Sequence, residues 1–184
     1  MTRQPRLVPA SLDPAQAAVY RSITEGPRGN GPFALVDADG ALRGPFGGFL
    51  LSPRLGDALQ RLGAAVRYEG SLSDRCRELA ILAVAAFHDS DFERKAHEAA
   101  GRVAGLSEME LAAVRDGAPD IGDETEQACL RLVRAMLRGD VDDETWSASV
   151  PPLDAAAAFE LTTLVGYYST LALQMRVLRV DQPR

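Results

Sequence analysis

The feature that most constrains the fold is a nine-residue stretch that is apolar on every side of a helix. Residues 79–87 read LAILAVAAF. A helix that is apolar all round must be buried on nearly all sides, whereas a surface helix has only an apolar stripe. We therefore expect a helix from Ser71 or Ser73 to about His88 at the centre of the fold.

The rest of the chain repeats its apolar residues with a period near 3.6 and has almost no alternating, strand-like runs. The sequence therefore predicts an all-α bundle with short connections. Proline, glycine and N-cap signals predict the bounds of the other helices. These are about 14–23, 53–69, 90–105, 107–117, 124–138, 142–148 and 153–178.

The length of 184 residues and the 46% hydrophobic content fit one domain with a sizeable core. Residues 26–50 are rich in glycine and proline, which predicts an irregular segment. We therefore expect residues 1–184 to form a single helical domain. Its N-terminal extension, residues 1 to about 50, would consist of one helix and a Gly/Pro-rich loop.

The net charge of -6 argues against nucleic acid or an anionic membrane surface as the main partner. No apolar run has the length of a membrane span or a signal peptide, so we expect a soluble, cytoplasmic protein. Cys76 and Cys129 lie far apart, without a CxxC or a Cys/His cluster. This spacing predicts neither a disulfide framework nor a metal site, and both residues are interpreted as small buried hydrophobes.

One constellation of residues is suited to acid/base chemistry. Glu93 and His97 are four residues apart, so on a helix they share a face. The turn at residues 88–90 joins their helix to the apolar one as an antiparallel hairpin. Glu78 lies ten residues before this turn and His97 seven after it, and at ~1.5 Å per residue they reach similar heights. Glu78, Glu93 and His97 are therefore the candidate catalytic residues.

Each of these residues also has a purely structural interpretation. Ser90 and Glu93 fit a capping box at the start of a helix. Glu78 would be neutralised by Arg75 or another arginine, and His97 would be a core histidine bonded to Glu93. The residue types alone leave both interpretations open.

The motifs in residues 75–117 resemble those of the carboxymuconolactone decarboxylase and alkylhydroperoxidase D superfamily. They are Arg77-Glu78-Leu79, then Ser90-x-x-Glu93 with His97, then Gly105-Leu106-Ser107. The resemblance implies an alkylhydroperoxidase D-like helical bundle built around an antiparallel hairpin. Peroxidase members would need cysteines at positions 90 and 93. A serine and a carboxylate cannot cycle between dithiol and disulfide, so that chemistry is not expected here.

The resemblance therefore implies the decarboxylase-like branch: a cofactor-free acid/base lyase acting on a small, carboxylated, lactone-like substrate. His97 would donate or accept the proton, and Glu78 or Glu93 would set its protonation state. An anionic substrate would bind at Ser90 and at the arginines Arg75, Arg77 and Arg94. The resemblance implies no metal or organic cofactor.

Two alternatives follow from the same resemblance. The first is a thiol-dependent peroxidase in which Cys76 or Cys129 acts alone, which the absence of a CxxC disfavours. The second is a non-catalytic, oligomeric, ligand-binding member of the superfamily. In each case the resemblance implies a homo-oligomer, whether a dimer, a trimer or a hexamer.

Overall fold

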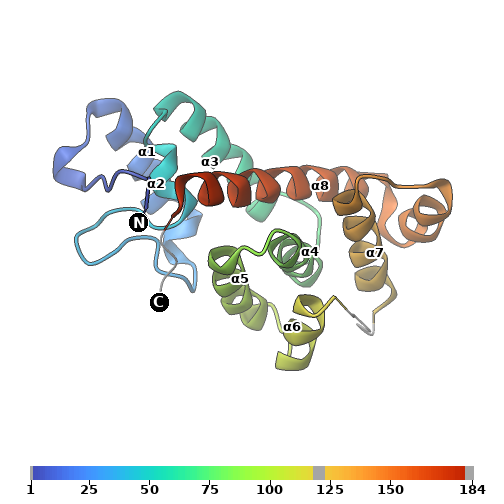
Figure 1. Cartoon of the computed structure of the whole chain (residues 1–184). Coiled ribbons are helices and arrows are strands. Elements are labelled where there is room, and N and C mark those ends of the chain that lie inside the picture. Colours follow the sequence, from blue (N-terminus) through green and yellow to red (C-terminus); the bar gives the residue numbers. More distant parts are fainter. Residues whose placement is uncertain (1, 118–122, 181–184) are drawn as a thin grey trace. The chain divides into compact units, whose positions relative to one another are not determined.

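The structure is a computed structural model that describes residues 2–117 and 123–180 (Figure 1). Regular structure in this part of the chain is helical, apart from an isolated antiparallel bridge between Val36 and Leu42. The all-α prediction is thus confirmed. The helices are α1 (Pro14–Thr24), α2 (Pro45–Phe49), α3 (Pro53–Tyr68), α4 (Asp74–Phe87), α5 (Asp91–Val103), α6 (Glu108–Arg115), α7 (Glu124–Arg138) and α8 (Asp143–Leu178).

The chain divides into two compact units. The first consists of Met1–Glu69 with Thr170–Arg184, and the second of Gly70–Ser169. We describe each unit by itself, and the expectation of a single domain stays a prediction. Within the described residues, no helix is long and apolar enough to cross a membrane.

Helix α4 lies at the centre of the second unit, where it packs against α5, α6 and α7 (Figure 1). Every residue of 78–85 is buried. Burial of a large aliphatic side chain contributes roughly 1.5–3 kcal/mol, so this helix supplies much of the unit's stability. The all-round apolar stretch therefore has the central place that the sequence predicts for it.

A tight turn joins α4 to α5. His88 is the C-terminal cap of α4, Asp89 takes a left-handed conformation with φ of 50°, and Ser90 is the N-cap of α5. The imidazole Nε2 of His88 lies 2.9 Å from the hydroxyl of Ser169. The chain reverses here, so α4 and α5 form the predicted antiparallel hairpin.

Helix α8 contains a break where the sequence predicts the boundary between two helices. Pro151 and Pro152 lie inside it, and Asp154 is non-helical with φ 65° and ψ 170°. Proline lacks the N–H that continues a helix, and the carboxylate of Asp154 accepts a hydrogen bond from the backbone N–H of Ala157. This bond caps the longer section that follows.

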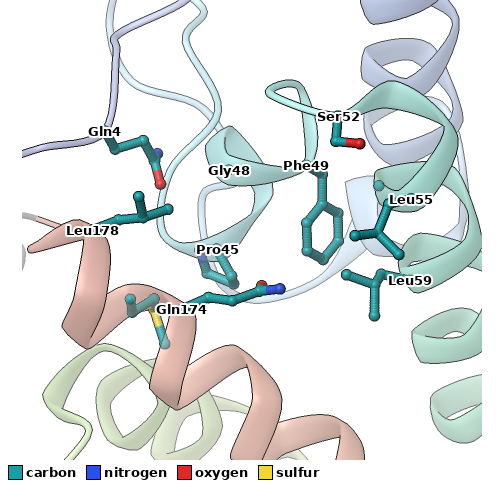
Figure 2. A pocket seen from close by; sticks show the side chains of 11 residues that line it. Gln4, Pro45, Gly48, Phe49, Ser52, Leu55, Leu59, Gln174 and Leu178 are labelled. Carbon is teal, nitrogen blue, oxygen red and sulfur yellow. The ribbon is translucent and has the colours of Figure 1, made fainter.

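The first unit is built on α3, against which α1 and α2 pack. Asp13 and Gln16 form a capping box at the start of α1. The unit holds an apolar cavity of 110 Å³, seen in Figure 2. Its lining carries no charged side chain and consists of Gln4, Pro45, Gly48, Phe49, Ser52, Leu55, Gly56, Leu59, Gln174, Met175 and Leu178.

Candidate active site around His97

The hairpin brings the three predicted catalytic residues together. Glu78 comes from α4, and Glu93 and His97 lie one turn apart on α5. The Nδ1 atom of His97 is 2.7 Å from Oε2 of Glu78, and its Nε2 atom is 3.5 Å from Oε2 of Glu93. The imidazole therefore has a strong hydrogen bond on one side and a looser ionic contact on the other.

This Glu–His–Glu site is buried. Glu78 is 2% exposed, Glu93 4% and His97 7%. Removing carboxylates from water is costly unless partners compensate for the lost hydration. Among the described residues, Oε1 of Glu93 and Nε of Arg77 are buried without a hydrogen-bond partner. Such atoms are uncommon in folded proteins, and each needs an explanation.

Tyr168, in α8, contributes an aromatic contact to the site. Its ring lies 5.1 Å from the His97 ring at an interplanar angle of 88°, and the Tyr167 ring lies 5.2 Å from that of Tyr168. Edge-to-face contacts of this kind restrict the rotation of both rings. The sequence predicts only an apolar face for this stretch of α8. Its one visible signal was a pair of tyrosines in an otherwise largely aliphatic run.

Arg75, a predicted substrate-binding residue, is engaged in a cluster that joins α4, α6 and α7. Its Nε is 2.6 Å from Oε1 of Glu126, its Nη1 donates to the carbonyl oxygen of Gly105, and Nη2 contacts Glu110. Glu126 and Glu110 raise the pKa of the Arg75 guanidinium. Glu78 is therefore not neutralised by Arg75, contrary to one structural interpretation of the sequence.

The other predicted binding residues lie at the start of the hairpin helices. Arg77 pairs with Asp74, and its Nε is 3.9 Å from Oε1 of Glu78, so it borders the site. Arg94 pairs with Asp91 at 2.8 Å and contacts Glu98 at 3.5 Å. Of the three predicted arginines, Arg77 is the one placed beside the Glu–His–Glu site.

The capping-box interpretation of Ser90 and Glu93 is wrong. Ser90 is the N-cap of α5, but its side chain makes no capping hydrogen bond. Glu93 lies against His97 instead. The matching pattern at Ser107 and Glu110 does form a reciprocal box at the start of α6.

This difference gives a stability prediction. We expect Ser107→Ala to lower the free energy of unfolding by about 1 kcal/mol, because a capping hydrogen bond is lost. Ser90→Ala should change it by less than about 0.5 kcal/mol, since no such bond exists there. Urea denaturation of the two variants side by side measures both values. A larger loss for Ser90→Ala than for Ser107→Ala would contradict this account.

A second prediction concerns acid stability. Hydrogen bonds from Ser107 and the charge of Arg75 lower the pKa of Glu110 from 4.5 to about 2. A carboxyl with a lowered pKa in the folded state stabilises the fold fully above its unfolded pKa and loses this effect as pH falls toward the folded one. We expect the unfolding free energy to fall by about 2 kcal/mol between pH 4.5 and pH 2 through this group, after solvent screening. Urea titrations in that range should show a smaller fall for Glu110→Gln.

The two cysteines lie together but outside the contacts of His97. Cys76 in α4 and Cys129 in α7 are free and buried, and Sγ of Cys129 is 3.5 Å from the carbonyl oxygen of Cys76. A hydrogen bond between the thiols lowers the pKa of Cys76 to about 7 and raises that of Cys129. The described residues contain no cluster of His, Cys, Asp and Glu arranged to hold a metal ion.

The all-α unit with its antiparallel hairpin has the alkylhydroperoxidase D-like helical fold. Residues 53–135 match the model of the carboxymuconolactone decarboxylase family. That range includes Glu78, Glu93 and His97. The match covers 83 of the 184 residues, so this part of the chain is similar to that family.

Solved structures support the same fold. A protein of unknown function from Agrobacterium tumefaciens, provisionally described as the antioxidant defence protein AhpD, is 20% identical over 74% of this chain and 95% of its own, with a TM-score of 0.67. A variant of the debrominase Bmp8 in complex with 2,3,4-tribromopyrrole is 14% identical over 98% and 91%, with a TM-score of 0.76. Unliganded Bmp8 is 13% identical over 92% and 87%, with a TM-score of 0.71. At these identities the likeness shows the fold alone. A comparison with curated proteins gave no match.

Proposed function

We propose that this protein is a cofactor-free acid/base lyase that removes carbon dioxide from a small, carboxylated, lactone-like substrate. The observation that carries the proposal is the 2.7 Å hydrogen bond between His97 and Glu78, opposite the contact of the same ring with Glu93. A histidine held in this way has one nitrogen fixed and the other available for proton transfer. The superfamily includes enzymes, which is consistent with this role.

The proposed reaction proceeds in two steps. The bond between the substrate's carbon and its carboxylate breaks, carbon dioxide leaves, and the electron pair moves into the conjugated lactone carbonyl. His97 then delivers a proton from Nε2 to the substrate carbon and regains one from solvent. Glu78 accepts the hydrogen bond from Nδ1–H and stabilises the protonated ring. Glu93 lies next to Nε2, the nitrogen that donates the proton, and keeps it in position.

Arg77 is our first choice for binding the substrate carboxylate. Its Nε is buried, lacks a hydrogen-bond partner among the described residues and lies near Glu78. A guanidinium N–H and a carboxylate form a strong, charge-assisted hydrogen bond. Arg77 also pairs with Asp74, but it is the predicted arginine that contacts Glu78, so Arg75 and Arg94 rank behind it. The Ser90 hydroxyl, which makes no capping bond, is a further candidate for a substrate contact.

The experiment is an assay of the wild-type protein in deuterium oxide. A panel of unsaturated carboxylactones is incubated with protein dialysed against a chelator, and both carbon dioxide and the deuterium content of the product are measured. We expect carbon dioxide and product in equal amounts, with one deuterium on the product carbon that is protonated after carbon dioxide leaves. If no member of the panel releases carbon dioxide, or if product forms without solvent deuterium, the proposal fails.

The thiol alternative is tested in the same experiment. A double variant with Cys76→Ser and Cys129→Ser should release carbon dioxide at the wild-type rate, because neither thiol contacts His97. If the wild type instead consumes peroxide and the double variant does not, a thiol peroxidase is the better assignment.

A non-catalytic ligand-binding role is a second candidate, and the 7% exposure of His97 favours it. In that case the Glu–His–Glu site stabilises the helix pair and does not move protons. His97→Gln would then lower the melting temperature without changing any turnover. A homo-oligomer remains the expected state for both candidates. Light scattering that finds only the 19.7 kDa chain would contradict it.

A further inference from the structure

The second unit contains a cavity of 270 Å³ at the C-terminal ends of α4, α6 and α7. Its apolar part is formed by Ala83, Ala86, Phe87, Val114 and Leu137, and its polar part by Arg115, Asp116, Arg134 and Arg138. None of the three catalytic candidates lines it. Three arginines therefore face one carboxylate in a partly apolar cavity that is distinct from the Glu–His–Glu site.

One nitrogen of the Arg134 guanidinium lacks a hydrogen-bond acceptor. Its Nη2 is buried and has no hydrogen-bond partner among the described residues. Burial, with a smaller effect from the like charge of Arg138, lowers the pKa of the Arg134 guanidinium. A buried charged donor without an acceptor carries a desolvation cost. Arg134 lines the cavity, so an anion bound there would lie beside its guanidinium.

The positions of Arg115 and Arg138 in the cavity are explained by the structure, whereas that of Arg134 is not. Arg115 lies in the last turn of α6 and Arg138 in the last turn of α7, where a cation offsets the partial negative charge of the helix end. Arg115 also contacts Glu98 at 3.6 Å. Arg134 lies about one turn before the end of α7 and has no such pairing in the described residues. Its position in the cavity is the one that neither a helix end nor an ion pair explains.

We propose that this cavity binds a small amphipathic organic anion, with its carboxylate on Arg134 and its apolar body against Phe87 and Leu137. The carboxylate is a counter-charge to the Arg134 guanidinium, and Arg138 adds a second attractive charge. The apolar walls select a ligand with a hydrocarbon body over a bare inorganic ion. Phe87 is 56% exposed and gains burial when such a ligand binds.

Benzoate is the probe, and benzamide is its uncharged control of the same shape. Titration of the full chain, followed by calorimetry and by amide NMR spectra, should show saturable benzoate binding with shifts at Ala86, Val114 and Leu137. Benzamide should bind at least about tenfold more weakly, because it offers no charge to Arg134. Higher salt should weaken benzoate binding, since the cavity is open to solvent.

Four variants test whether benzoate binds in this cavity. Arg134→Gln should weaken benzoate binding by about tenfold or more, and Arg61→Gln, which removes an exposed arginine of the first unit, should not change it. Ala86→Met fills the cavity without altering its charge and should also weaken binding. His97→Gln should leave benzoate binding unchanged, which separates this cavity from the Glu–His–Glu site.

Three results would overturn the proposal. The first is equal binding of benzoate and benzamide. The second is unchanged benzoate affinity in both Arg134→Gln and Ala86→Met, or shifts centred on His97. The third is failure of benzoate to bind while Arg134→Gln changes the mass found by light scattering. That last result would make an acidic group of a second copy the acceptor.

Discussion

Replacing His97 by glutamine is expected to lower kcat/KM for decarboxylation by roughly 10²–10⁴-fold, the usual contribution of a positioned acid/base group. Glutamine is similar in length and its amide can still donate to Glu78, so the buried carboxylate keeps a partner. It cannot release and regain a proton. The loss should therefore fall on kcat, while KM changes little, because substrate binding depends on other groups.

His88 provides the matched control. It is the only other histidine in the chain, and it lies at the end of α4 with its imidazole on Ser169. We expect His88→Gln to keep at least about half of the wild-type kcat/KM, since it is outside the contacts of the site. Both variants should be checked for folding by circular dichroism. Equal, small losses in the two variants would remove His97 from the chemistry.

The pH dependence of turnover distinguishes a catalytic His97 from a merely structural one. Proton transfer by His97 should make wild-type turnover dependent on pH, whereas the residual turnover of His97→Gln should lack that dependence. A merely structural histidine would leave the two profiles parallel. Glu78→Gln should lower kcat as well, because the protonated imidazole then loses its buried counter-charge.

Local sequence patterns predicted most of the helices and the meeting of Glu78 and His97 in the candidate site. The apolar stretch 79–87 predicted a central helix because its period and its all-round character are properties of the segment itself. The meeting of Glu78 and His97 could be predicted because both are close in sequence to one tight turn. Over such short distances the helical rise alone sets the relative heights of two residues.

Contacts between distant segments could not be predicted in this way. Ser90 and Glu93 have the same pattern as Ser107 and Glu110, but only the second pair forms a capping box. Glu93 has His97 one turn later on its own helix as a competing partner, and no histidine follows Glu110 in α6. Tyr168 is 71 positions beyond His97, so nothing in the spacing connected it to the site.

The partners of Arg75 could not be predicted from the sequence either. The sequence favoured a substrate or Glu78 as its partner, whereas its donors go to Glu126, Glu110 and Gly105. These acceptors are 51, 35 and 30 residues away. Only the packing of α6 and α7 against α4 brings them together. The position therefore has a stability role that can be measured.

We expect Arg75→Met to lower the free energy of unfolding by about 2–3 kcal/mol, between the values of a surface pair and a fully buried one, because the Arg75 side chain is 31% exposed. Glu126 is only 6% exposed, and in the variant its carboxylate would remain buried without its bidentate partner. Methionine keeps much of the aliphatic length, so lost packing contributes little. Urea denaturation at neutral pH measures the loss.

Arg61→Met is the control, because Arg61 forms an exposed pair with Asp57 one turn away on α3. We expect it to change stability by less than about 1 kcal/mol, the usual value of a surface pair. The double variant Arg75→Met with Glu126→Gln should recover part of the loss, since a neutral amide is less costly to bury than an unpaired carboxylate. If Arg75→Met loses no more than Arg61→Met, the cluster is not a stabilising ion pair. Arg75 then becomes available again as a residue that binds substrate.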